Sequence, residues 1–164
     1  MNPFFSNFRF VAIVSMLLLM ACGESLEERI VSTYPNGLPT QVIYHAKGNP
    51  DQVVKEVRFY DNGEKQEEGR FQEGQRHGKW VYWYPNGQKW SEGYFFDGER
   101  DGEARVWYDN GNLHYTGQYD KGVTAGEWLF YTPEGDKLKR VVYENGKKLS
   151  EESFEPKKKG FPAR

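Results

Sequence analysis

The chain has 164 residues, a formal net charge of −2 and a single cysteine, Cys22. One cysteine excludes an intramolecular disulfide, and the lack of a basic excess argues against a nucleic-acid partner. Aromatic residues make up 16% of the chain and it holds 18 glycines, a composition that favours strands joined by tight turns.

The first 21 residues have the layout of a secretory signal. A polar start with one positive charge, Arg9, is followed by an apolar run over residues 10–21. As a helix this run would cover about 18 Å, well short of the roughly 30 Å of a hydrocarbon core, so it is too short to span a membrane. The run ends Leu19-Met20-Ala21-Cys22, which resembles the bacterial lipobox. The resemblance implies signal cleavage after Ala21 and lipidation of Cys22.

Lipidation of Cys22 predicts an envelope protein whose membrane partner is reached through the lipid anchor. Several acyl chains would make such an attachment stable. Gly23 follows the cysteine where an aspartate would direct inner-membrane retention, which resembles outer-membrane sorting in a host with two membranes. Residues 22–29 are then expected to be the lipidated cysteine and a tether.

Residues 30–148 repeat with a period of 24. Four glycine columns and two aromatic columns keep this step, among them Gly63, Gly87, Gly111 and Gly135, and Phe59, Trp83, Trp107 and Tyr131. A degenerate first copy carries Tyr34-Pro35-Asn36-Gly37, which matches Tyr84-Pro85-Asn86-Gly87. The period predicts about five copies, at 30–54, 55–78, 79–102, 103–126 and 127–148.

Each copy predicts one β-hairpin. Residues 79–84 and 88–95 are rich in aromatic and β-branched side chains, and Asn86-Gly87 between them is typical of a type I′ turn. The residues expected at such turns are Asn62, Gly63, Asn86, Gly87, Asn110 and Gly111. Asp97-Gly98 is expected to open a longer connection to the next copy. A lone hairpin is marginal in water, so the copies must stack to be stable.

The expected fold class is therefore all-β, an elongated antiparallel meander of β-hairpin repeats with about ten short strands. Gly69, Gly93 and Gly117 fall inside return strands, where a large ring lying across the bare backbone would compensate for them. We expect Trp83 and Trp107 to be these rings and to form the core. Residues 149–164, which include three consecutive lysines, are expected to be a flexible basic tail.

The repeat resembles the MORN repeat family in its bacterial variant, the antitoxin-type MORN repeats. The matching pattern begins with Tyr-Pro-Asn-Gly, at Tyr84, and continues with Glu-Gly-x-Phe, at Glu92. Its third part is Asp-Gly-x-x-x-Gly-x-Trp, whose aspartate is represented by Asp97 and whose tryptophan is represented by Trp80 of its preceding copy. The resemblance implies hairpin arrays used for protein or lipid contacts, and an antitoxin role for some members. A lipoprotein signal does not suit an antitoxin whose target is cytosolic.

No catalytic, metal or cofactor signature accompanies the repeats, and we expect neither an enzyme nor a bound cofactor. The three histidines, His45, His77 and His114, fall at unrelated places in the 24-residue frame. The glycines are periodic and belong to turns rather than to a phosphate-binding loop.

The candidate binding surface consists of Trp90, Tyr94, Trp80 and Tyr82. Exposed rings on a sheet stack on sugars or anchor peptides, whereas buried rings would be core. Two functions remain open: a protein-binding module, with an immunity-like or antitoxin-like role, and a glycan or cell-wall binder. A polar-rimmed aromatic groove would favour a glycan, and a flat face would favour a protein.

Overall fold

The computed structural model describes residues 25–155, so Ala21, Cys22 and the predicted signal peptide lie outside the described residues. The strands are β1 (Leu26–Thr33), β2 (Pro39–Ala46), β3 (Asn49–Phe59), β4 (Lys65–Gln72), β5 (Gln75–Trp83), β6 (Lys89–Phe96), β7 (Glu99–Trp107), β8 (Leu113–Asp120), β9 (Val123–Tyr131), β10 (Lys137–Glu144) and β11 (Lys147–Ser153). Over residues 25–155, no helix has the length and apolarity needed to cross a membrane.

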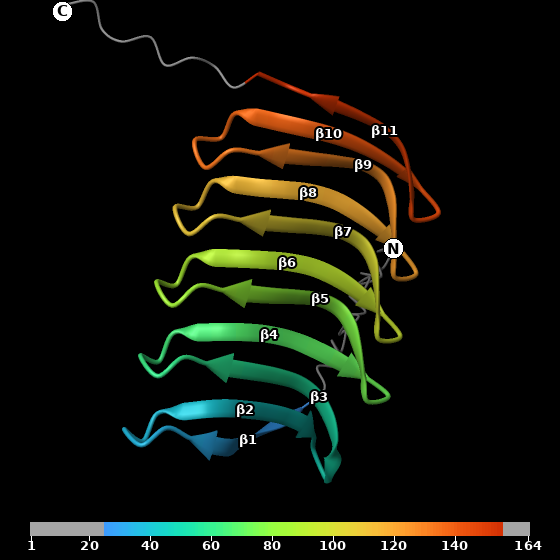
Figure 1. Cartoon of the computed structure of the whole chain (residues 1–164). Coiled ribbons are helices and arrows are strands. Elements are labelled where there is room, and N and C mark those ends of the chain that lie inside the picture. The colour runs from blue at the N-terminus through green and yellow to red at the C-terminus, as the bar shows by residue number, and fades with distance from the viewer. Residues whose placement is uncertain (1–24, 156–164) are drawn as a thin grey trace, which may run out of the picture.

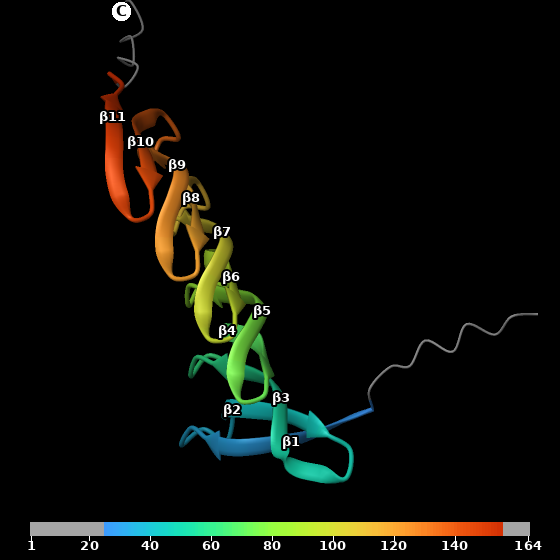
Figure 2. The ribbon, with the colours of Figure 1, turned by 90° about the vertical axis from the view of Figure 1, so that its right-hand side faces the viewer.

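The strands form one sheet in which every strand pairs antiparallel with its neighbours in sequence, from β1 to β11. Figure 1 shows the hairpins stacked one after another, and Figure 2, at right angles, shows that the stack is long and narrow. The predicted meander of hairpin repeats is confirmed. It has eleven strands rather than ten, because β1 begins before residue 30 and β11 continues into residues 149–153, which the sequence analysis gave to the tail.

The turn within each copy is not the predicted type I′ turn. In Tyr84-Pro85-Asn86-Gly87, the Gly87 N–H donates to the Tyr84 carbonyl (2.9 Å) and the Tyr84 N–H donates to the Gln88 carbonyl (2.8 Å). Only Gly87 has a positive φ, +80°, whereas a type I′ turn needs one at Asn86 as well. This is the three-residue loop in which a type I turn leads into a glycine bulge, and the Asn62 and Asn110 turns are built alike.

The type I′ turns lie between copies instead. Asp97 and Gly98 both have positive φ, +48° and +84°, and they join Phe96 directly to Glu99 across the sheet. The same pair of positive angles recurs at Glu73-Gly74, Lys121-Gly122 and Asn145-Gly146. The connection expected to be longer is therefore the tightest turn in the repeat.

Each copy bends at a bulge on its first strand. Between the pairs Glu68–Val81 and Arg70–His77 the strand β5 has extra residues, among them Gly78 with φ +68°. Bulges of this kind bend a strand and increase its twist. The strands are accordingly curved in Figure 1.

We call that face the groove face, which carries Trp80, Tyr82, Ser91 and Phe95; the other, the ladder face, carries Lys79, Val81, Glu92 and Tyr94. Trp80 is fully buried, and a Cβ on Gly69 would lie 2.1 Å from its indole. Trp128 covers Gly117 equally closely and is 5% exposed.

The expectation that Trp83 and Trp107 are the covering rings is therefore wrong. Trp83 lies three residues after Trp80, beyond a register shift, and pairs with Lys89. Trp83 is only half-buried on the ladder face, where the Lys65 ammonium lies 5.6 Å from its ring centroid. Trp80, placed by the sequence analysis in the binding surface, belongs to the core.

Successive copies are tied by two hydrogen-bond columns. The tyrosine hydroxyls donate to backbone carbonyls of the following copy over 2.7–2.9 Å: Tyr34 to Phe59, Tyr60 to Trp83, Tyr84 to Trp107 and Tyr108 to Tyr131. The turn asparagines do the same, for example Asn86 to the Asp109 carbonyl at 3.2 Å. Both columns stop at the last copy, where Thr132 and Glu134 replace them.

Candidate functional site

Two adjoining hollows on the groove face share Tyr82 and Trp90. The first has a volume of about 300 Å³ and is also lined by Arg58, Tyr60, Gln66 and Glu67. The second has a volume of about 470 Å³ and is also lined by Ser91, Arg100, Val106, His114 and Tyr115. We call these two hollows together the groove.

The floor of the second hollow is one cross-strand row. Tyr82 pairs with Ser91, Ser91 with Val106, and Val106 with Tyr115, so the row runs from β5 to β8. Side chains of directly paired residues stand side by side on the same face of a sheet. The row therefore crosses two hairpins and lies along the axis on which the copies stack.

Two side-chain rings at equivalent positions of the repeat lie beside this floor. Trp90 and His114 are 24 residues apart and each contacts the tyrosine of its own turn. The Trp90 ring centroid lies 6.3 Å from Tyr84, and the His114 ring stacks on Tyr108 at 4.2 Å with an angle of 28° between the ring planes. Trp90 is 47% exposed, so one large ring surface is open to a ligand.

Phenol and guanidinium groups supply polarity in the groove. An Arg76 nitrogen donates to the Tyr82 hydroxyl over 2.8 Å. Burial raises the pKa of Tyr82, although the charges of Arg76 and Arg100 act in the opposite direction. Burial also raises the pKa of Tyr115. Because the unperturbed value is already near 10, both phenols are neutral hydrogen-bonding groups at pH 7.

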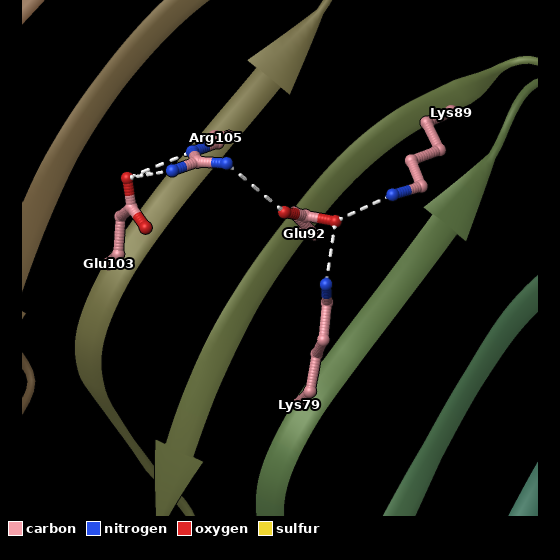
Figure 3. Close-up of polar contacts among 5 residues, drawn as sticks. All are labelled: Lys79, Lys89, Glu92, Glu103 and Arg105. Atoms are coloured by element: carbon pink, nitrogen blue, oxygen red, sulfur yellow. Dashed lines mark hydrogen bonds and ion pairs between the residues drawn. The ribbon is translucent and has the colours of Figure 1, made fainter.

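The ladder face is charged, but its charges are paired with one another. Glu92 accepts from Lys89 at 2.9 Å and Lys79 at 3.0 Å, while Arg105 lies 3.9 Å away and is held at 2.6 Å by Glu103 (Figure 3). One copy earlier, Lys55 and Lys65 each lie 2.6 Å from Glu68 in the same arrangement. These ion pairs recur with the repeat and link neighbouring strands, which gives them a structural role.

The four residues of the predicted surface do not form one site. Tyr82 and Trp90 meet in the groove with ring centroids 6.0 Å apart, and Trp80 is buried in the core. Tyr94 pairs with Lys79 and is 42% exposed on the ladder face. The predicted turn residues, Asn62, Gly63, Asn86, Gly87, Asn110 and Gly111, lie at the hairpin ends away from the strands.

Sequence reasoning missed Ser91, Arg100, His114 and Tyr115. The signal that could have found His114 is its place in the 24-residue column of Trp90. Treating the three histidines as unrelated overlooked this match.

A larger hollow of about 690 Å³ lies on the groove face at the N-terminal end of the sheet. Its lining includes Ile43, Val53 and Phe71 with the carboxylates of Asp51, Glu56 and Glu73. Glu56 is ion-paired with Arg58. Across residues 25–155, no group of three or more His, Cys, Asp or Glu side chains is placed to hold a metal ion.

The family description "MORN repeat variant" matches residues 76–97 and 100–121. These two segments are MORN repeats of this variant family. The two matched repeats comprise β5 with β6 and β7 with β8, so the MORN repeats carry the floor of the groove. No curated protein matches the sequence.

Three solved structures are similar to this chain over most of its length. The Glycosylation Associate Protein (Gap123) complex from Streptococcus agalactiae matches 71% of this chain and 20% of that chain, at 15% identity and a TM-score of 0.41. The crystal structure of TarM matches 76% of this chain and 20% of that chain, at 13% identity and a TM-score of 0.32. A second TarM structure, from S. aureus, matches 75% and 20% with the same identity and TM-score. The chain thus spans about a fifth of the length of these structures.

Proposed function

We propose that this MORN repeat protein is a non-catalytic envelope protein that binds an oligosaccharide along the groove. The observation that carries the proposal is the polar-rimmed groove, in which the half-exposed Trp90 ring stands beside a floor of Tyr82, Ser91 and Tyr115. Aromatic rings with a polar edge combine an apolar surface with hydrogen-bonding capacity, which suits the faces and hydroxyls of sugars.

The spacing of the rings also suits a chain of sugars. Trp90 and His114 occupy equivalent positions in successive hairpins, two strands apart. At about 4.8 Å between strands, equivalent positions are roughly 10 Å apart, close to the length of a disaccharide. A linear oligosaccharide lying along the stack would therefore meet one ring for every two sugars.

The decisive experiment measures binding of the mature chain to a panel of immobilised bacterial oligosaccharides. Trp90→Ala should weaken binding at least tenfold and leave the melting temperature nearly unchanged, because Trp90 is a rim residue. Tyr94→Ala, an exposed ring on the ladder face, is the matched control and should retain wild-type affinity. Loss of binding in Tyr94→Ala but not in Trp90→Ala would place the site on the other face and refute the proposal.

The envelope location rests on Leu19-Met20-Ala21-Cys22. We propose lipidation at Cys22 and cleavage after Ala21, with outer-membrane sorting if the host has two membranes. Cys22→Ser should abolish labelling by an incorporated fatty-acid probe and leave an unprocessed precursor. Normal processing together with unchanged membrane partition of this variant would contradict the lipid anchor.

The second candidate is a protein partner, in an immunity-like or antitoxin-like role. The observation that favours it is the pair of exposed rings near the β6–β7 turn, Tyr94 at 42% and Phe96 at 57%. Interface energy tends to concentrate in aromatic and arginine side chains. A partner captured from the envelope fraction that is released by Tyr94→Ala and retained by Trp90→Ala would favour this candidate.

A further inference from the structure

Arg76 and Arg100 occupy the same position in successive repeats, yet only Arg76 is held by polar partners. The Arg76 guanidinium lies 4.1 Å from the Trp80 ring centroid, donates to the Tyr82 hydroxyl at 2.8 Å, and lies 4.0 Å from a Glu67 carboxylate oxygen. These three contacts supply it with a stacking surface, an acceptor and a counter-charge.

All three partners of Arg76 are replaced in the next copy. The residues 24 positions after Trp80, Tyr82 and Glu67 are Ala104, Val106 and Ser91. The Arg100 guanidinium keeps only ring contacts, at 5.5 Å from the Phe95 centroid and 5.4 Å from the Tyr119 centroid. Within residues 25–155, no carboxylate lies within ion-pair distance of it.

The replacement of Trp80 by Ala104 also opens space. A Cβ on Gly69 would collide with the Trp80 ring at 2.1 Å, whereas a Cβ on Gly93 would have an Arg100 nitrogen as its nearest neighbour, at 3.7 Å. The Arg100 guanidinium therefore lies where the preceding copy has the Trp80 indole and the following copy has that of Trp128. It faces the hollow of about 470 Å³ whose lining contains Arg100 and no Asp or Glu.

We propose that Arg100 binds an anionic group of the saccharide in this hollow, either the carboxylate of a uronic acid or a sugar phosphate. This inference rests on the proposed function and specifies its ligand. A guanidinium presents paired N–H donors that match an oxyanion, and charge-assisted hydrogen bonds are roughly twice as strong as neutral ones. Arg100 is solvent-exposed and therefore accessible to a ligand, and the Ser91 hydroxyl and the His114 ring lie in the same hollow for further contacts with the sugar.

The test compares matched probes on the full mature chain by titration calorimetry. Trigalacturonate and its methyl ester share a backbone and differ in charge, while galacturonate and galactose 6-phosphate separate carboxylate from phosphate as the preferred anion. The wild type should bind at least one anionic probe ten times more tightly than its neutral counterpart, and Arg100→Gln should abolish this preference. Arg100→Lys should restore only part of it, because a point charge lacks the paired donors.

Two further variants give Arg100 the kinds of partner that Arg76 has, a carboxylate and an indole. Ser91→Glu supplies the missing counter-charge and should remove the preference for the anion without unfolding the chain. Ala104→Trp supplies the missing ring and should weaken binding of every probe. Arg105→Gln, which removes a guanidinium from the ladder face, is the control and should leave the preference intact.

The possible outcomes distinguish the role of Arg100 from saccharide binding itself. Equal affinity for acid and ester, with both lost in Trp90→Ala, would overturn the role of Arg100 and leave saccharide binding standing. A preference for the anion that survives Arg100→Gln would also overturn it. A mature chain that binds no saccharide of the panel, acidic or neutral, would overturn both.

Discussion

Gly69, Gly93 and Gly117 hold the same position in three successive copies but have different neighbours. Gly69 and Gly117 lie beneath indole rings, which a Cβ would approach to 2.1 Å, whereas the atoms nearest to a Cβ on Gly93 lie at the ordinary contact distances of 3.7 and 3.8 Å. The need for glycine at this column therefore depends on whether a tryptophan covers it.

A matched pair of substitutions tests this at the residue scale. Gly69→Ala should lower the free energy of unfolding by about 1–3 kcal/mol or more, because the indole must shift out of a packed position. Gly93→Ala should be neutral or raise it by about 0.5 kcal/mol, because alanine restricts the unfolded chain. Urea unfolding measures both, and equal destabilisation would contradict the covering role of Trp80.

The tryptophans should likewise differ in their contribution to stability. Trp128, 5% exposed and packed on Gly117, should cost about 3–5 kcal/mol when replaced by alanine. Trp107→Ala should cost clearly less because Trp107 is only half-buried. Thermal unfolding of the two variants provides the comparison, and a larger loss for Trp107→Ala would reverse the assignment of the core.

At the scale of the hairpin, the 24-residue period was enough to predict the strands, their order and their antiparallel pairing. It could not predict which tryptophan is buried. The column of Trp83 is aromatic in every full copy, whereas the column of Trp80 reads Glu56, Trp80, Ala104 and Trp128. Periodicity favoured the unbroken column, but the bulges decide which face each ring reaches, and a one-residue change of register reverses that face.

The turns were misassigned for a related reason. Asn-Gly suits a two-residue type I′ turn, but the strands here leave a three-residue loop, closed by the hydrogen bond from the Tyr84 N–H to the Gln88 carbonyl. The first loop residue, Pro85 or the aspartate in its place, has a negative φ and begins a type I turn. Asn86 is used differently: its side-chain oxygen accepts the Gln88 N–H at 3.0 Å and its nitrogen reaches the next copy. Only half of the groove could be predicted from the sequence. Arg100 has no polar partner among residues 25–155 because Ala104, Val106 and Ser91 replace the residues that hold Arg76, and a search for recurring residues overlooks such replacements.

The ion pairs of the ladder face should make hairpin pairing depend on pH. Burial raises the pKa of Glu92, but hydrogen bonds and charges from Lys89 and Lys79 outweigh it, so the pKa is lowered. A carboxylate whose pKa is lower in the folded state stabilises the fold above its unfolded value of about 4.3, and this contribution is lost as pH falls through the folded value.

Glu92→Gln should therefore be less stable than the wild type at pH 7, and the difference should disappear in acid below the folded pKa of Glu92. Denaturant unfolding from pH 7 to pH 3 measures this. Glu103→Gln, at a side chain that is 51% exposed, is the control and should show a smaller difference at pH 7. A Glu92→Gln deficit that is constant across this range would mean that packing, not charge, accounts for it.

For the whole molecule, the tyrosine column ties each copy to the one after it and ends at Thr132. The Thr132 hydroxyl is buried and makes no hydrogen bond with the described residues. Tyr108→Phe removes a 2.9 Å hydrogen bond to the Tyr131 carbonyl and should cost about 1 kcal/mol. Thr132→Val should be neutral or stabilising, because it removes an unpaired polar group without changing volume.

Urea midpoints measure both changes, and Tyr94→Phe, on an exposed ring, is a control expected to have no effect. A Thr132→Val variant that is as unstable as Tyr108→Phe would show that the hydroxyl of Thr132 is engaged, and that the column continues beyond the last copy.

The strictly sequential order of the strands also determines how the protein would respond to tension. β1 and β11 lie at opposite ends of the sheet, and β11 has one neighbour only (Figure 1). A pull between β1 and β11 acts along the backbone hydrogen bonds, which then open one pair of strands at a time from an end of the sheet instead of shearing together. Each 24-residue repeat that peels away would release roughly 80 Å of extended chain. We therefore expect the array to lengthen stepwise at low force and, if the proposed anchor and ligand are correct, to act as an extensible link between them.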